Sequence, residues 1–133
     1  MPRGRSHYRV TMGDVLASHT RALRKGGRPG IRDENAILAA IARPYTGFHR
    51  TIAKKATALI EAIAMNHGFI DGNKRTSIIL TVSMIEQSGF TFDALGNEDL
   101  DATIEALVLS IVRHEITSEA VEAWFKARIH RTG

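Results

Sequence analysis

The sequence predicts an all-α fold, a single-domain bundle of about six helices around a buried central helix. Apolar residues recur at steps of three and four over long segments, and only three prolines interrupt the 133 residues. Capping and glycine stop signals are well separated, which leaves room for long helices. The length fits one domain with one core. We place that domain at residues 11–133, after a basic, solvated tail over residues 1–10 that carries Arg3, Arg5 and Arg9.

The first helix has a clear start and a clear end. Thr11 and Asp14 match a capping box in front of an apolar pattern, and Lys25 with the following glycines matches a basic last turn and a stop. The segment GGRPG, residues 26–30, is typical of a turn. It lacks the lysine and the spacing of a phosphate-binding P-loop, so the turn is assigned no nucleotide role.

The second helix is expected from about Arg32 to Ala42. Asp33 is a suitable cap near its start, and Pro44 stops it. Residues 44–50, PYTGFHR, have no helical period and indicate a short extended loop or hairpin.

The next two helices carry the strongest apolar signals. A helical stripe runs through Ala56, Leu59, Ile60, Ile63 and Ala64, and His67 is its next member. Residues 76–89 are apolar on almost every face, interrupted only by small hydroxyl side chains until Glu86. A helix that is apolar all round is buried on all sides, so this segment is predicted to be the central helix, ended by Gly89.

The remaining third of the chain predicts two more helices. Apolar and polar residues alternate weakly over residues 90–96, which predicts a short strand or a loop. Asn97 is a suitable cap for a fifth helix, and Thr117 or Ser118 for a sixth that includes Ile129.

Composition narrows the class of protein. The chain has no cysteine, which excludes disulfides, thiolate metal sites and a catalytic thiol and suits a cytoplasmic protein. It shows neither a signal peptide nor an apolar run long enough for a membrane span. The net charge of +4 suits an acidic partner or a nucleotide. The basic residues are not clustered on one helix face, which argues against a helical nucleic-acid binder.

One segment between the third and central helices is chemically unusual: HGFIDGNKR, residues 67–75. Lys74 and Arg75 fall at a helix start, where unpaired N–H groups and the helix dipole already supply positive charge. A bound phosphate, approaching closely because Gly72 has no side chain, would pair with the two basic side chains and with the unpaired N–H groups. The alternative is two basic side chains that extend into solvent.

The other polar residues of this segment also have two interpretations. Asp71 is either a helix cap or a ligand for a hard cation such as Mg²⁺, and Asn73 is either a cap or a phosphate donor. Phe69 is interpreted as a structural pin that holds the loop to the core. His67 is either a core histidine or a general base, and its polar neighbours favour the base.

The segment HGFIDGNKR resembles the Fic/Doc signature H-x-F-x-(D/E)-(G/A)-N-(G/K)-R at every fixed position. The stretches at residues 26–44 and 62–76 resemble the death-on-curing, or Doc, branch of that family. The resemblance implies an all-α fold and the transfer of a phosphorus-containing group from ATP to a protein hydroxyl. It implies the following roles: His67 as the base, Asp71 as the Mg²⁺ ligand, Gly72 as the opening of the anion hole, and Asn73, Lys74 and Arg75 on the nucleotide phosphates. By position alone, Tyr45, Thr46, Gly47 and Phe48 are expected to form a flap that clamps the target.

Two positions bear on the reaction. Relatives that transfer AMP usually have glycine where this chain has Lys74, and a second arginine where it has Ile78. Lysine at the first position is the Doc pattern, which implies a toxin that transfers the γ-phosphate of ATP to a Ser or Thr hydroxyl of a translation factor such as elongation factor Tu. Gly72 favours the alternative, because Doc has alanine there and the wider family of AMP transferases has glycine. An inactive Fic-fold binding module is the third possibility.

Regulation is expected from a separate protein. Many relatives carry an inhibitory helix with the pattern (S/T)-x-x-x-E-(G/N), and residues 118–123, SEAVEA, end in alanine instead. The resemblance therefore implies an antitoxin supplied in trans, and contact with nucleic acid only through that antitoxin.

Overall fold

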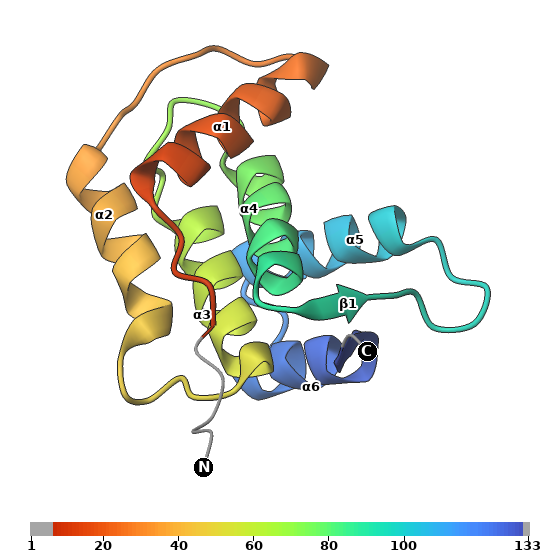
Figure 1. Cartoon of the computed structure of the whole chain (residues 1–133). Helices are drawn as coiled ribbons and strands as arrows, with labels where there is room; N and C mark the ends of the chain where they lie inside the picture. The colour runs from red at the N-terminus through yellow and green to blue at the C-terminus, as the bar shows by residue number, and fades with distance from the viewer. Residues whose placement is uncertain (1–6, 132–133) are drawn as a thin grey trace.

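The computed structural model describes residues 7–131 and confirms the all-α prediction (Figure 1). The described chain holds six α-helices, two short 3₁₀ helices and two short strands. In chain order they are α1 Met12–Ala22, η1 Leu23–Lys25, α2 Glu34–Ala42, η2 Arg43–Tyr45, α3 Ile52–Met65, α4 Asn73–Gln87, β1 Phe90–Phe92, α5 Leu100–Val112, α6 Ser118–Arg128 and β2 Ile129–Arg131. No helix among these is long and apolar enough to cross a membrane.

A side-chain cap starts every described α-helix except one. A side-chain oxygen at the N-cap accepts a backbone N–H in each of five helices, from Thr11, Asp33, Thr51, Asp99 and Thr117. Thr11 and Asp14 form the predicted capping box in full. The cap predicted at Asn97 is wrong, because the N-cap of α5 is Asp99. The exception is α4, which begins at Gly72 with no side-chain cap.

The innermost helix is α3, and not the predicted segment 76–89. Ten of the fourteen residues of α3 are buried, against six of the fifteen residues of α4. Along α4, Thr76 and Thr81 are fully buried, while Ile78 and Ile79 are only half-buried. The short side chains on the inner side of α4 allow close helix packing, because the separation of two helices depends on the side chains between them. Leu80, Met84 and Ile85 are fully buried on this side of α4. Ile78 and Ile79 instead line a hollow between α1, α4 and α5.

The segment that precedes α1 is packed against the bundle over its described part. Val10 is buried and donates its N–H to the Tyr45 hydroxyl at 2.9 Å, and that hydroxyl donates to the Tyr8 carbonyl at 2.6 Å. The solvated tail predicted for residues 1–10 is therefore wrong for residues 7–10. Arg3 and Arg5 lie outside the described residues.

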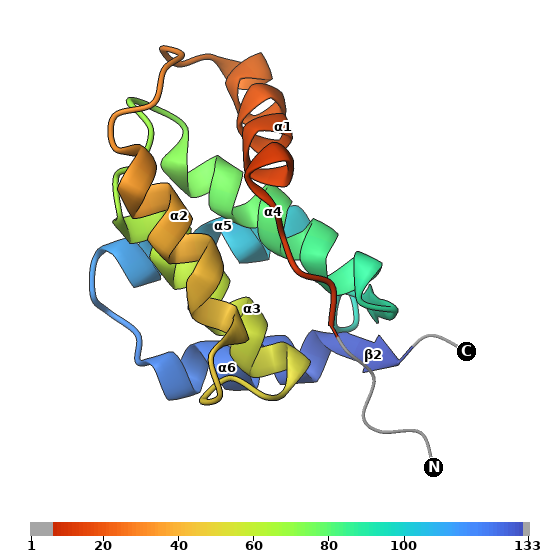
Figure 2. The same ribbon diagram turned by 60° about the vertical axis from the view of Figure 1, so that its left-hand side comes forward.

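The end of the described chain pairs with the strand that follows α4. β1 and β2 pair antiparallel, with Phe90 opposite Arg131 and Phe92 opposite Ile129. The structure thus confirms a short strand within residues 90–96, but places Ile129 in a strand instead of the last helix. Figure 2 shows β2 extending from α6 at the edge of the bundle.

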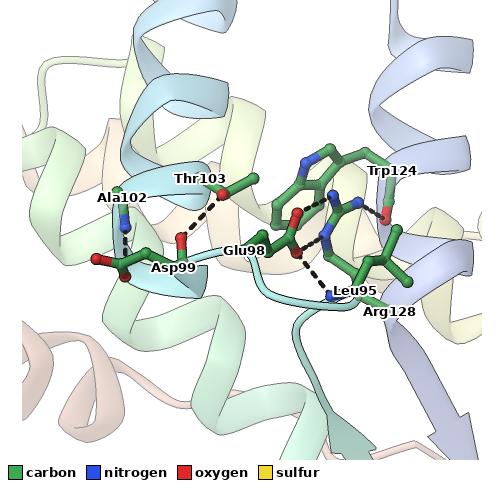
Figure 3. A network of polar contacts seen from close by, with 7 residues as sticks. All are labelled: Leu95, Glu98, Asp99, Ala102, Thr103, Trp124 and Arg128. Carbon is green, nitrogen blue, oxygen red and sulfur yellow. Dashed lines mark hydrogen bonds and ion pairs between the residues drawn. The ribbon is translucent and has the colours of Figure 1, made fainter.

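A polar network fastens the loop before α5 to the end of α6 (Figure 3). The buried guanidinium of Arg128 donates to both carboxylate oxygens of Glu98, at 2.6 and 2.8 Å, and to the Trp124 carbonyl at 3.0 Å. It also lies 4.1 Å from the centre of the Trp124 ring. These bonds, together with the N–H of Leu95, lower the pKa of Glu98 to about 2.

This lowered pKa predicts an acid-sensitive contribution to stability. The pKa of Glu98 falls from an ordinary value of 4.5 to about 2 on folding, so the stabilisation is present above the higher value and is lost as pH falls through the lower one. Glu98→Gln should therefore lower the melting temperature at neutral pH and much less near pH 2. Thermal unfolding followed by circular dichroism measures the difference in melting temperature between the variant and the wild type at each pH. Glu105→Gln, which removes a more exposed carboxylate, is the control. If the loss of melting temperature in Glu98→Gln did not depend on pH, the prediction would be contradicted.

Candidate active site

The unusual segment forms the connection between α3 and α4, and a second connection, residues 28–33, lies beside it. The N–H groups of Arg32 and Asp33 donate to the Gly68 carbonyl at 2.7 and 3.0 Å. The Ile70 N–H donates to the Gly30 carbonyl at 3.0 Å, and Ile31 and Phe69 form an antiparallel bridge. Figure 1 shows both connections at the same end of the bundle. We call residues 66–72 the motif loop.

His67 lies outside α3, which corrects the prediction that it continues the apolar stripe. The helix ends at Met65, Asn66 is its C-cap, and His67 follows with a φ of 52°. This is the left-handed conformation that glycine usually supplies just after a helix, and it costs a non-glycine residue about 1–2 kcal/mol. The turn directs the imidazole into solvent, where it is exposed. Strain of this kind is common at functional sites.

Phe69 and Asn73 hold the motif loop in shape. Phe69 is 1% exposed. Its backbone N–H donates to Asn73 Oδ1 and its carbonyl accepts from Asn73 Nδ2, both at 3.0 Å. The carboxamide of Asn73 is thus occupied within the loop.

Asp71 points toward the adjacent connection and does not cap α4. Its Oδ2 accepts the backbone N–H of Arg28 at 2.8 Å, and the half-buried carboxylate lies close to Gly27, where a Cβ would come within 3.3 Å of the Asp71 Cβ. Oδ1 accepts no hydrogen bond from the described residues, so one carboxylate oxygen is available as a ligand.

The start of α4 concentrates positive charge. Its N-cap is Gly72, at a φ of 82°, so no side chain there satisfies the first N–H groups of the helix. Lys74 is exposed, and Arg75 is half-buried with a loose ion pair to Glu105 at 3.9 Å. Two cations at the positive end of a helix dipole attract an anion and do not stabilise the helix.

Two hollows adjoin this end of α4. One, of about 130 Å³, lies between α4 and α5 and is lined in part by Lys74, Arg75 and Ile78. The other, of about 350 Å³, reaches the end of α1 and brings Arg24 and Lys25 to the same region as Arg75. The cationic surface around the helix start is therefore larger than the motif loop alone.

The structure does not bring residues 45–48 to the motif loop. They precede α3, whereas His67 follows it, and a helix of 14 residues is about 21 Å long. Figures 1 and 2 show the two segments at opposite ends of α3. Residues 43–45 form the short helix η2, and residues 46–50 form a loop, which was one of the two predicted alternatives; the other, a hairpin, is absent from the described chain. Phe48 in this loop is 87% exposed.

Sequence reasoning missed the segment that does lie beside the motif loop. The sequence predicts only a turn with no nucleotide role at residues 26–30. Residues 28–33 nevertheless form four hydrogen bonds with the motif loop, three between backbone groups and one from a backbone N–H to the carboxylate of Asp71. The glycines were the available signal. Gly27 and Gly30 have φ values of 114° and 125°, and a Cβ on Gly30 would lie 2.8 Å from Ile70.

The sequence profile of the Fic/DOC family matches residues 9–85. This chain belongs to the Fic/DOC family. It is also similar to the Toxin Doc of Mycolicibacterium smegmatis, with 34% identity over 96 residues that cover 65% of this chain and 72% of the relative. The family match spans α1 to α4 and so includes both the motif loop and residues 28–33.

The helix whose sequence partly matches the inhibitory pattern packs against α3 in this Fic/DOC chain. Residues 118–123 belong to α6, where Glu122 pairs with Lys54 of α3 at 3.1 Å. Ser118 donates to Glu61, also of α3, at 2.8 Å. These contacts make α6 a structural partner of α3.

Proposed function

We propose that this Fic/DOC protein is a Doc-type toxin that transfers the γ-phosphate of ATP to a Ser or Thr hydroxyl of a protein. The observation that carries the proposal is an exposed imidazole on a strained backbone at His67, close in sequence to the uncapped, cationic helix start at Gly72–Arg75. The first group suits proton removal, and the second suits binding of a polyphosphate.

The phosphates would lie against the first turn of α4. The N-cap Gly72 has no side chain to bond the first backbone N–H groups of α4, so phosphate oxygens can accept hydrogen bonds from them. Lys74 and Arg75 would add charge-assisted hydrogen bonds to the same oxygens. The carboxamide of Asn73 is bonded to Phe69, so its contribution there would come through its backbone N–H.

His67 would act on the incoming hydroxyl. A neutral imidazole takes the proton of the Ser or Thr hydroxyl as its oxygen bonds to the γ-phosphorus, and the bond from that phosphorus to the bridging oxygen breaks to release ADP. The exposed position of His67 leaves room for a target segment. Residues 28–33 border the motif loop and would form one side of the entrance for that segment.

Asp71 fits the Mg²⁺ that such a reaction uses. Magnesium prefers one or two carboxylates together with phosphate oxygens, and Asp71 supplies one carboxylate oxygen beside the phosphate cradle. Within the described residues, no group of three His, Asp or Glu side chains lies close enough to hold a metal without the nucleotide. When bound, the ion would neutralise charge on the phosphates.

The choice of phosphoryl transfer over AMP transfer is supported by two side chains. Lys74 matches the Doc pattern, and Ile78 lines the hollow where relatives that transfer AMP would place a second arginine. Gly72 is the observation in favour of AMP transfer, because Doc has alanine at this position and the wider family has glycine.

The relative's name, Toxin Doc, supports a toxin and, with it, an inhibitory partner protein. A toxin of this kind is restrained by an antitoxin, and we propose that a separate antitoxin covers the nucleotide mouth in trans in the cytoplasm. We further propose a translation factor such as elongation factor Tu as the target class.

Labelled ATP distinguishes the reactions. We expect label from the γ-phosphate, and none from the α-phosphate, to appear on a target protein in a lysate incubated with this chain and Mg²⁺. Label from the α position alone would show AMP transfer and reject the kinase. Transfer of neither label, together with biological effects that persist in His67→Ala, would indicate a binding module.

A further inference from the structure

The motif loop is also supported from α1, by a buried histidine that the motif does not include. His19 is 6% exposed, and its ring stacks on Phe69 with the centroids 3.7 Å apart and the planes 10° apart. Its Nε2 lies 2.9 Å from the Asp71 carbonyl oxygen. Because a carbonyl oxygen only accepts, Nε2 carries the hydrogen and donates it.

The same ring borders the first residue of the phosphate cradle. A Cβ placed on Gly72 would come 3.5 Å from Cδ2 and 3.6 Å from Nε2 of His19. One imidazole thus contacts the ring of Phe69 and the carbonyl of Asp71, and it lies beside the position that a side chain at residue 72 would occupy.

The other anchors of the loop act elsewhere along it. Asn73 holds the backbone of Phe69, and residues 28–33 hold the backbone of Gly68 and Ile70. Arg28 bonds only the carboxylate of Asp71. The carbonyl of the Asp71–Gly72 peptide is held by His19, and this peptide sets the direction of the Asp71 side chain and of the first N–H groups of α4.

We propose that His19 is a positioning residue of the phosphotransfer site, which fixes the Asp71–Gly72 peptide through its donated hydrogen bond. The proposal rests on the function proposed above. It predicts that loss of the donor weakens nucleotide binding even when the stack on Phe69 and the fold are retained.

Two variants separate the hydrogen bond from the stack. His19→Phe keeps a flat ring against Phe69 and removes the donor, while His19→Gln keeps a donor at a similar reach and removes the stack. We expect His19→Phe to weaken binding of ADP with Mg²⁺ by about 2- to 12-fold, the value of one neutral hydrogen bond, and to raise KM for ATP more than it lowers kcat. His19→Gln should restore most of the affinity. Titration calorimetry and initial rates measure these effects.

Val15→Ala is the matched control. Val15 is a fully buried residue of the same helix, so its truncation lowers stability while the hydrogen bond from His19 to the Asp71 carbonyl is kept. It should lower the melting temperature and leave ADP affinity unchanged wherever the variant is folded. Equal losses of affinity in His19→Phe and Val15→Ala would overturn the proposal, because they would reflect destabilisation alone.

Amide hydrogen exchange tests the same proposal without nucleotide. The amides of residues 72–75 should exchange faster in His19→Phe than in the wild type and in Val15→Ala. Unchanged exchange in His19→Phe would refute the positioning role. If His19→Phe does not fold, His19→Gln provides the test. Because that variant keeps a hydrogen-bond donor, faster exchange of the amides of residues 72–75 in it would refute the proposal. Failure of the proposed function is distinguishable, because the wild type itself would then transfer no label.

Discussion

Replacing His67 with alanine is expected to lower the rate of phosphoryl transfer by about 10²- to 10⁴-fold, the usual contribution of a general base. Stability should change by less than about 0.5 kcal/mol, because the exposed imidazole makes no hydrogen bond in the described structure. Affinity for ADP should also be retained, since the phosphates contact α4. Single-turnover transfer from ATP labelled on the γ-phosphate, with thermal unfolding in parallel, measures these quantities.

His114 provides the matched control for this variant. It is exposed, follows α5 as His67 follows α3, and has a φ of 57°. The Glu115 N–H completes the helix end by donating to the Ser110 carbonyl at 2.9 Å. His114→Ala should therefore reproduce any backbone effect of the substitution and leave transfer within about twofold. Comparable losses in both variants would show that His67 acts through the backbone and not as a base.

Replacing Gly68 with alanine is expected to destabilise the fold by about 1–3 kcal/mol, as overpacking does. Gly68 is buried, and a Cβ there would overlap Cγ1 of Ile37 and lie 3.6 Å from the Asp33 carbonyl. The loop would have to move away from α2, which would lengthen the hydrogen bonds from Arg32 and Asp33 to the Gly68 carbonyl. Transfer should fall together with stability. Urea unfolding and transfer assays test this.

A double variant identifies the cause. Ile37→Ala makes room for the added methyl group, so the double variant Gly68→Ala, Ile37→Ala should lose less stability than the sum of the two single changes. Gly13→Ala is the control, because its Cβ would meet only Thr11 Oγ1 at 3.6 Å. Additive losses in the double variant would show that Gly68 is needed for a reason other than space.

The parts of this molecule that local chemistry controls could be predicted from the sequence. The capping box at Thr11 and the caps at Asp33 and Thr117 depend on residues within three positions of each other, and they lie where predicted. The motif could be found for the same reason, since its residues lie within nine positions.

Features that depend on distant contacts could not be predicted. The burial of α4 depends on which face meets α3, and periodicity cannot show this for a helix that is apolar all round. His19 carries no local sign that its ring lies on Phe69, 50 positions away. The segment at residues 45–48 was assigned by its order in the chain, which does not show that it is separated from the motif by the whole length of α3.

The anchoring of the motif loop by main-chain groups has an evolutionary consequence. Because Gly68, Ile70 and Gly30 bond through their peptide groups, the exposed side chains of Arg28, Ile31 and Arg32 are not needed to hold the loop. Substitutions there can accumulate without loss of the geometry at His67. Homologues could thus diverge in the targets they recognise while the chemistry they perform is inherited unchanged.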